Sequence, residues 1–255
     1  MIPSPSTAFQ IIEIEPGNRH QQGLFLRLPF RLYADIPQWV PPLEMDIRPV
    51  FNRRTHPFYQ TGEAAFLLAI GPDEEVIGRL AVLYNRKYNE FNREKTAFFT
   101  LFECKNNPEA ARALFDAACS WARTHQLDRL VGPKGFSTLD GMGLLVKGFE
   151  HRPAFGLPYH LPYYSSLLET AGLSPTNDTV SGYLEMSRIV FPEKIRRAAE
   201  LVQKRRGIRI VRFRNRREFA RVLPALQELY NRSLEGTTGN MPLSSTEVKT
   251  MADQM

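Results

Sequence analysis

Hydrophobic residues along this chain change their spacing several times, and the changes predict a protein that contains both strands and helices. Short apolar runs bounded by turn residues predict strands at 9–15, 64–70, 76–83, 96–103, 130–131 and 180–186. Apolar residues at helical spacing predict helices at 24–32, 108–122 and 163–171. This order favours an α/β (α+β) fold, in which an antiparallel meander joined to a crossover unit forms one mixed sheet flanked by helices.

Particular residues mark where several of these helices begin and end. Asn107 is suited to cap the helix that starts at Pro108, since a proline at the first helical position sacrifices no hydrogen bond. Gly172 is expected to end the helix at 163–171. Pro29 lies inside the first helix and is expected to kink or split it.

The end of the chain repeats its beginning. A predicted helix at 195–206 ends at Gly207 and is followed by a strand at 208–213 and a helix at 219–230. Shifted by 197 positions, residues 11–33 match residues 208–230 at six of 23 positions. A strand and one or two helices cannot bury their own apolar faces. We therefore predict a first domain at 1–190, a basic linker helix at 191–206 and the N-terminal fragment of a second, similar domain at 207–255.

The charge of the chain is concentrated in one segment. The 255 residues carry a net charge of +6, but Lys194 to Arg221 contain twelve basic and two acidic residues, a net +10. The remaining 21 basic and 25 acidic residues make the rest of the chain −4. Apolar residues of this segment account for one face of the linker helix, so we interpret the arginines as its solvated face and do not expect a nucleic-acid partner.

Several classes of function find no support in the sequence. The longest apolar run, Ala64–Ile70, is too short to span a membrane, the opening residues lack a secretory signal, and two cysteines form no disulfide framework. We therefore expect a cytoplasmic protein. The motifs G-x-S-x-G, H-E-x-x-H, C-x-x-C and Walker A are absent, and the five histidines lack ligand spacing. We expect no metal.

One strand-to-helix junction could bind an anion, at Glu103-Cys-Lys-Asn-Asn-Pro108. A helix N-terminus offers free N–H groups, and Lys105 would add a positive charge. Against this, no glycine lets the backbone approach a phosphate, and Pro108 removes one donor. An ordinary connection between a strand and a helix is the alternative interpretation.

Longer phrases resemble the GNAT superfamily of acyl-CoA N-acyltransferases, in particular a bacterial branch of tandem GNAT-like proteins. The order of elements agrees with that fold. The phrases that carry the resemblance are Tyr33-Ala-Asp-Ile-Pro-Gln-Trp-Val-Pro-Pro-Leu43, His56-Pro57-Phe58, Ile77-Gly-Arg-Leu-Ala81, Phe98-Phe-Thr-Leu-Phe-Glu103, Gly132-Pro133, Gly143-Leu-Leu-Val-Lys-Gly-Phe149, Pro162-Tyr163-Tyr164 and Glu169-Thr-Ala-Gly-Leu173. They cover nearly the whole chain, and Tyr230-Asn231 with Pro242 resemble the start of the second GNAT domain.

The resemblance implies a place for acetyl-CoA or another acyl-CoA. Its pantetheine would pair with the fourth strand at Leu101 and Phe102, and its pyrophosphate would rest on the turn of Cys104, Lys105, Asn106 and Asn107. This chain departs from the family there, because the Q/R-x-x-G-x-G/A turn has lost both glycines.

The resemblance also implies two catalytic residues. In the family, a tyrosine late in the fold commonly protonates the leaving thiolate, and it stands four residues before a glycine. In this chain Leu168 stands at that position, four residues before Gly172. Tyr164, one helical turn earlier, is the candidate for this role. A carboxylate base often lies near the fourth or fifth strand, and Glu103 is the nearest candidate.

Three functions follow as hypotheses. The first is an N-acyltransferase that moves an acyl group from acyl-CoA to a small-molecule or peptide amine. In this hypothesis the first domain has lost part of its cofactor site, and its partner is a second GNAT-like domain of the same chain. The second is a ligand-binding or assembly domain of the same fold without catalysis. The third is a Fem-type peptidyl transferase that takes aminoacyl-tRNA.

Overall fold

The computed structural model describes residues 9–137, 140–154, 156–190, 192–208, 211–236 and 240–254. Its strands are β1 (Gln10–Glu13), β2 (Gly62–Ile70), β3 (Val76–Asn85), β4 (Thr96–Cys104) and β5 (Arg129–Val131). Its α-helices are α1 (Arg19–Leu32), α2 (Glu44–Ile47), α3 (Arg86–Asn92), α4 (Pro108–Thr124), α5 (Tyr164–Thr170), α6 (Glu193–Arg206), α7 (Arg216–Ser233) and α8 (Ser245–Gln254). Short 3₁₀ helices occupy Arg48–Phe51, Pro57–Gln60 and Met186–Arg188.

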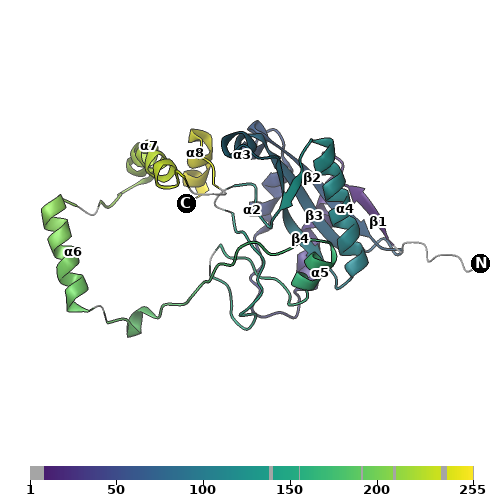
Figure 1. The fold of residues 1–255 in the computed structure, drawn as a ribbon, viewed down its shortest axis with the longest axis horizontal. Coiled ribbons are helices and arrows are strands. Elements are labelled where there is room, and N and C mark those ends of the chain that lie inside the picture. The colour runs from purple at the N-terminus through teal and green to yellow at the C-terminus, as the bar shows by residue number, and fades with distance from the viewer. Residues whose placement is uncertain are drawn as a thin grey trace, which may run out of the picture. The chain divides into compact units, whose positions relative to one another are not determined.

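The five strands form one sheet in chain order, β1-β2-β3-β4-β5. The first four are antiparallel neighbours, whereas β5 runs parallel to β4 after the crossover through α4 (Figure 1). This confirms the predicted fold class, a mixed and mainly antiparallel sheet flanked by helices. The two residues at the start of α4 also behave as predicted, since the Asn107 side chain accepts from the Ala110 N–H and Pro108 takes the first helical position.

Apolar side chains fill both faces of the sheet. On one face, α4 and α5 cover a cluster that includes Phe99, Phe102 and Leu114. On the other face, α1 and the 3₁₀ helix at Pro57–Gln60 cover a second cluster that includes Phe25 and Phe98. The candidate site described below lies at the end of β4, where both faces are closed by helices.

Strand β4 is irregular near its end. Its register with β3 shifts between Arg79 and Ala81, and Leu101 adopts a left-handed conformation with φ of 52°. Strand β4 pairs with β3 as far as Cys104 but with β5 only as far as Phe98. The last residues of β4 therefore diverge from β5, so that this edge of β4 has no strand beside it.

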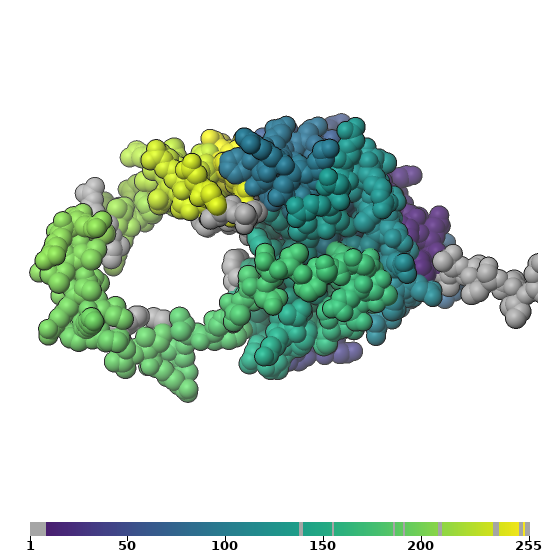
Figure 2. All heavy atoms as spheres, viewed as in Figure 1, coloured from purple at the N-terminus to yellow at the C-terminus, as the bar shows by residue number. Residues whose placement is uncertain are grey.

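The chain falls into two compact units, residues 1–174 with 227–255 and residues 175–226. In the first unit, atoms of the C-terminal segment lie directly against α3 (Figure 2). In the second unit, α6 ends at Gly207, as predicted, and none of its described side chains is buried. Glu193 forms ion pairs with Arg196 and Arg197 on its surface, which agrees with a solvated face.

Three predictions about local structure differ from the structure in whole or in part. Residues 180–186 form no strand: they pair with none of the five described strands, and Val180, Tyr183 and Leu184 are exposed, Val180 by 97 %. Of the kink or split expected at Pro29, the split does not occur, because α1 continues to Leu32. In the predicted strand at 208–213, residues 209 and 210 lie outside the described residues, and 211–213 are not in a strand.

The start of α7 repeats the start of α1. The Asn18 side chain accepts from the N–H of Gln21 at 3.1 Å, and the Asn215 side chain accepts from the N–H of Glu218 at 3.0 Å. Both pairs are related by the same shift of 197 positions that relates the two sequences. The division into two related domains stays a prediction, and this shared cap supports it.

Candidate functional site

The two residues predicted to be catalytic lie in direct contact. Tyr164, the first residue of α5, donates from its hydroxyl to Oε2 of Glu103 at 2.6 Å. Tyr33, directly after α1, donates to the same oxygen at 2.8 Å. Three elements that are far apart in the sequence thus converge on one carboxylate, whose side chain is 12 % exposed.

A buried arginine faces this carboxylate from the neighbouring strand. Arg79 lies opposite Glu103 in the β3–β4 register and is only 3 % exposed. Its Nη2 lies 3.9 Å from Oε1 of Glu103, and its guanidinium stacks over the ring of Phe25 at 4.7 Å. Among the described residues, no acceptor is within hydrogen-bond reach of its Nε.

Arg79 donates to the backbone carbonyl of Phe25, which has no partner within α1 because residue 29 is a proline. In a regular helix the N–H of residue 29 would donate to the carbonyl of Phe25, but Pro29 has no N–H. The Phe25 oxygen instead accepts from Nη1 of Arg79 at 2.7 Å. Pro29 therefore shapes the site, although the sequence indicates only that it disturbs the helix.

Burial determines the protonation of this cluster. Desolvation raises the pKa of Glu103, while the positive charge of Arg79 and the two phenol hydrogen bonds lower it. Desolvation and the charge of Glu103 also raise the pKa of Tyr33 and of Tyr164, so both phenols stay protonated and donate. A carboxylate with a raised pKa is suited to accept a proton near neutral pH.

Tyr164, the first residue of α5, and Tyr163, directly before it, also occupy the edge of β4 that β5 leaves open. The Cys104 N–H donates to the hydroxyl oxygen of Tyr164 at 3.2 Å, and the Tyr163 hydroxyl donates to the Cys104 carbonyl at 2.9 Å. The other predicted contacts of pantetheine lie nearby: Leu101 is half-buried, and Phe102 packs in the core against the ring of Phe115 at 5.0 Å.

The turn predicted to hold the pyrophosphate of acyl-CoA does not fit that group as it stands. The N–H of Ala110 already donates to the Asn107 side chain at 2.9 Å, and Pro108 has no N–H that could bind a phosphate. Lys105 forms an ion pair with Glu75 at 2.6 Å. Asn106 is exposed, and no glycine provides free backbone donors. The assignment of Cys104 to Asn107 as cofactor-binding residues stays a prediction, and no catalytic step is derived through the cofactor.

The sequence-based prediction missed Arg79 and Tyr33. A signal for Arg79 is present, because it is the one charged residue in the apolar run 76–83. A charged side chain in such a run is buried only when it has partners. Tyr33 gives no comparable signal, since its partner Glu103 lies 70 residues away.

A metal-binding cluster and a membrane-spanning helix are both absent among the described residues. Within them, no group of three or more His, Cys, Asp or Glu side chains is arranged to hold a metal ion. Their helices include none with the length and hydropathy needed to cross a membrane.

Comparison with known proteins gives two curated relatives, while no family model matches the chain. Protein YghO of Escherichia coli is 24 % identical over 242 residues, which are 93 % of this chain and 60 % of YghO. The bacterial ceramide synthase of Caulobacter vibrioides is 28 % identical over 155 residues, which are 60 % of this chain and 40 % of that enzyme. The chain therefore spans less than two thirds of the length of either relative.

Solved structures similar to the chain include acetyltransferases and a tandem GNAT protein. A tandem GNAT protein from the clavulanic acid biosynthesis pathway is 17 % identical, with a TM-score of 0.43 over 64 % of this chain and 43 % of its own. Glucosamine-6-phosphate N-acetyltransferase from Arabidopsis thaliana is 10 % identical, with a TM-score of 0.42 over 69 % of this chain and 99 % of its own. The fold assignment itself rests on the strand order and register of the chain's own sheet.

Proposed function

We propose that the chain is part of an N-acyltransferase that joins an acyl group to an amine, and that Glu103 accepts the proton that the amine loses. The observation that carries the proposal is the carboxylate of Glu103 with two phenol donors on one oxygen, at the end of β4 beyond its pairing with β5. A raised pKa suits this carboxylate to take the proton that a neutral attacking amine loses as the C–N bond forms.

The contacts supply a path for each proton. As the amine nitrogen forms a bond to the acyl carbon, its proton passes to Glu103, and the bond from the acyl carbon to the leaving group breaks. Tyr164 gives its phenol proton to the leaving group. Because burial disfavours a phenolate at this position, the proton on Glu103 returns along the 2.6 Å hydrogen bond to Tyr164. Both residues end in their starting state.

The comparisons suggest the class of acceptor. Ceramide is an N-acylated amino alcohol with a long alkyl chain, so the similarity to a bacterial ceramide synthase supports a long-chain amine as acceptor and a fatty acyl thioester as donor. Because Tyr164 protonates the leaving group, the thioester of the donor lies beside Glu103. The turn at Cys104–Asn107 does not fit a pyrophosphate, so the carrier of the acyl group is placed outside that turn.

The test is amide formation by the full-length protein, followed by mass spectrometry with sphinganine and palmitoyl-CoA. We expect Glu103→Gln to lower kcat by about 10²-fold or more, the usual effect of losing a general base. Glu90→Gln, at an exposed position of α3, is the matched control and should leave kcat unchanged. Full activity of Glu103→Gln would exclude the proposed role. If the wild-type protein forms no amide from any acyl thioester, the ligand-binding alternative replaces the enzyme.

A further inference from the structure

The two carboxylate oxygens of Glu103 have different surroundings. Both phenols donate to Oε2, Tyr164 at 2.6 Å and Tyr33 at 2.8 Å. The nearest atom of Arg79, Nη2, lies 3.9 Å from Oε1, which is too far for a hydrogen bond. Among the described residues, no donor lies within hydrogen-bond distance of Oε1. Because Oε2 already accepts from two donors, Oε1 is the oxygen that remains for an amine.

Contacts with α1 hold Arg79 away from this carboxylate. Its Nη1 donates to the Phe25 carbonyl at 2.7 Å, and its guanidinium lies over the Phe25 ring at 4.7 Å. Its Nε has no acceptor among the described residues. Buried donors without partners are unfavourable, so the guanidinium would gain hydrogen bonds by moving toward Oε1 of Glu103. The Phe25 carbonyl is the hydrogen-bond acceptor that opposes this movement.

The residue at position 29 decides whether that carbonyl is available. Any residue other than proline would direct a helical N–H at the Phe25 oxygen and compete with Arg79 for it. Pro29 is buried inside α1, and the helix continues past it to Leu32. A proline in a helix is locally unfavourable, and exceptions of this kind are expected where a functional site gains from them.

We propose that Pro29 is a positioning residue, which keeps Arg79 on the Phe25 carbonyl and so leaves Oε1 of Glu103 open to the proton of the amine. The role of Oε1 rests on the proposed function, whereas the placement of Arg79 does not. At 3.9 Å the cation still stabilises the carboxylate. A direct hydrogen bond from Arg79 would cover Oε1 and make Glu103 a weaker base.

The other titratable groups around Glu103 stay neutral. They are Tyr33 after α1, Tyr163 and Tyr164 at the start of α5, and Cys104 beside it on β4. Desolvation raises the pKa of each group, and it raises the pKa of Tyr163 and of Cys104 to about 12. Arg79 is therefore the charged group that faces the carboxylate, and a shorter distance between them lowers the pKa of Glu103.

The test is the titration of Glu103 in the whole chain by NMR of ¹³Cδ-labelled glutamate. The Glu103 signal is identified by its loss in Glu103→Gln. Pro29→Ala supplies an N–H that competes for the Phe25 carbonyl and lets Arg79 close on Oε1. We expect the pKa of Glu103 to fall in Pro29→Ala and to rise in Arg79→Met. In the amide-forming assay of the full-length protein, kcat of Pro29→Ala at pH 7 should fall about tenfold, less than in Glu103→Gln because the carboxylate remains.

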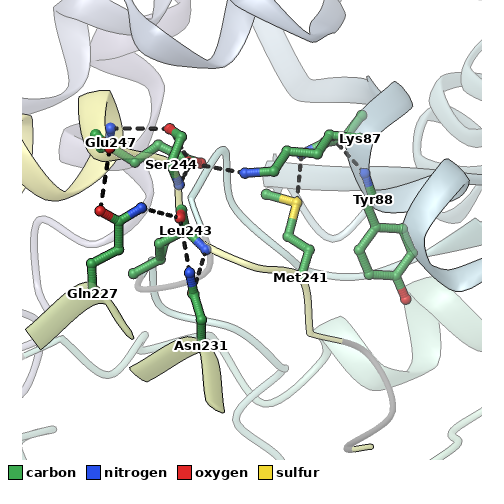
Figure 3. Close-up of polar contacts among 10 residues, drawn as sticks. Lys87, Tyr88, Gln227, Asn231, Met241, Leu243, Ser244 and Glu247 are labelled. Atoms are coloured by element: carbon green, nitrogen blue, oxygen red, sulfur yellow. Dashed lines mark hydrogen bonds and ion pairs between the residues drawn. The ribbon is translucent and has the colours of Figure 1, made fainter. Parts of the chain in front are cut away.

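Pro224→Ala is the matched control, because Pro224 also lies inside a helix, α7. The α7 side chains of Gln227 and Asn231 hydrogen-bond to Leu243, a contact that does not include Glu103 (Figure 3). Pro224→Ala should leave the pKa of Glu103 and kcat unchanged. Pro29→Ser supplies the same N–H as Pro29→Ala and serves as a second variant at the proposed position.

An unchanged or raised pKa of Glu103 in Pro29→Ala and Pro29→Ser would overturn the proposal. A lowered pKa in both variants, combined with no amide formation by the wild type, would support the placement of Arg79 and overturn the proposed function. An unchanged pKa in both variants, combined with a loss of kcat in Glu103→Gln, would leave the proposed function standing and overturn the role of Pro29.

Discussion

The buried pair of Arg79 and Glu103 allows a quantitative test of the site. In Arg79→Met, the carboxylate of Glu103 loses its cation and the carbonyl of Phe25 loses its donor. Removal of one partner of a buried ion pair costs about 3–5 kcal/mol. Glu103 keeps two phenol donors and its nearest distance to Arg79 is 3.9 Å, so we expect a loss near the lower end, about 3 kcal/mol.

Glu103→Gln leaves the buried charge of Arg79 without its partner, but the amide keeps an acceptor oxygen for the phenols and the guanidinium. We therefore expect a loss below the range for an ion pair, about 2 kcal/mol. Two unit charges 3.9 Å apart interact by about 4 kcal/mol at an effective dielectric constant near 20, which sets an upper limit for their coupling. Because the phenols share the charge of the carboxylate, we expect a coupling of about 2 kcal/mol. The double variant should therefore lose about 3 kcal/mol, not the 5 kcal/mol of two independent changes.

The assay is urea unfolding at pH 7 of the wild type, the two single variants and the double variant. Trp39 stacks on Tyr33 at 4.9 Å, so its fluorescence reports on the site. Arg31→Met is the control, because Arg31 is half-exposed and lies 3.6 Å from Glu75 at the surface; we expect a loss under about 1 kcal/mol. Additive losses within about 0.5 kcal/mol would refute the coupling.

Three further predictions concern other parts of the same unit. Burial lowers the pKa of His160 to about 4, below its value of about 6.5 in the unfolded chain. The free energy of unfolding should therefore be highest above pH 6.5 and fall by about 3 kcal/mol as the pH drops through 4. Urea unfolding at a series of pH values should show this loss, and His160→Asn should abolish it. In Gly132→Ala the new methyl group would lie 2.4 Å from a carbonyl oxygen of β4, so we expect a loss of more than about 2 kcal/mol in urea, whereas Gly182→Ala has open space and should be neutral. Burial raises the pKa of the Cys104 thiol to about 12, and Cys104 is 0 % exposed. Ellman's reagent should therefore label the partly exposed Cys119 first and Cys104 only in denaturant. Equal labelling rates for the two thiols would contradict the burial of Cys104.

The sequence predicts the sheet well, because its strands have strong local signals. The runs 64–70, 76–83 and 96–103 are apolar and bounded by turns, and each becomes a strand within two residues of the prediction. Helix α3 was missed because all seven of its residues are polar or aromatic and show no helical spacing of apolar side chains. Tyr88 and Asn89 are buried only through tertiary contacts. The wrong strand at 180–186 has the opposite cause: a suitable local pattern without a partner strand.

The candidate site was predictable in part. Glu103 and Tyr164 each follow from a resemblance to a family pattern, and the structure brings them into contact. The irregularity at Leu101, which precedes Glu103 on β4, depends on the pairing of β4 with β3. Arg79 and Tyr33 join the carboxylate through contacts across 24 and 70 residues, and no local pattern encodes such pairs.

The proline in α1 links the order of folding to the site. Isolated helices of this length are marginal in water, and a proline in the last turn weakens one further. Helix α1 gains a partner for its open carbonyl only when Arg79 arrives from β3, 54 residues later. The end of α1 should therefore become ordered after β3 has joined the sheet. Tyr33, which directly follows α1, would reach Glu103 in the same late step, so that the carboxylate becomes fully paired only once the folding of this unit is complete.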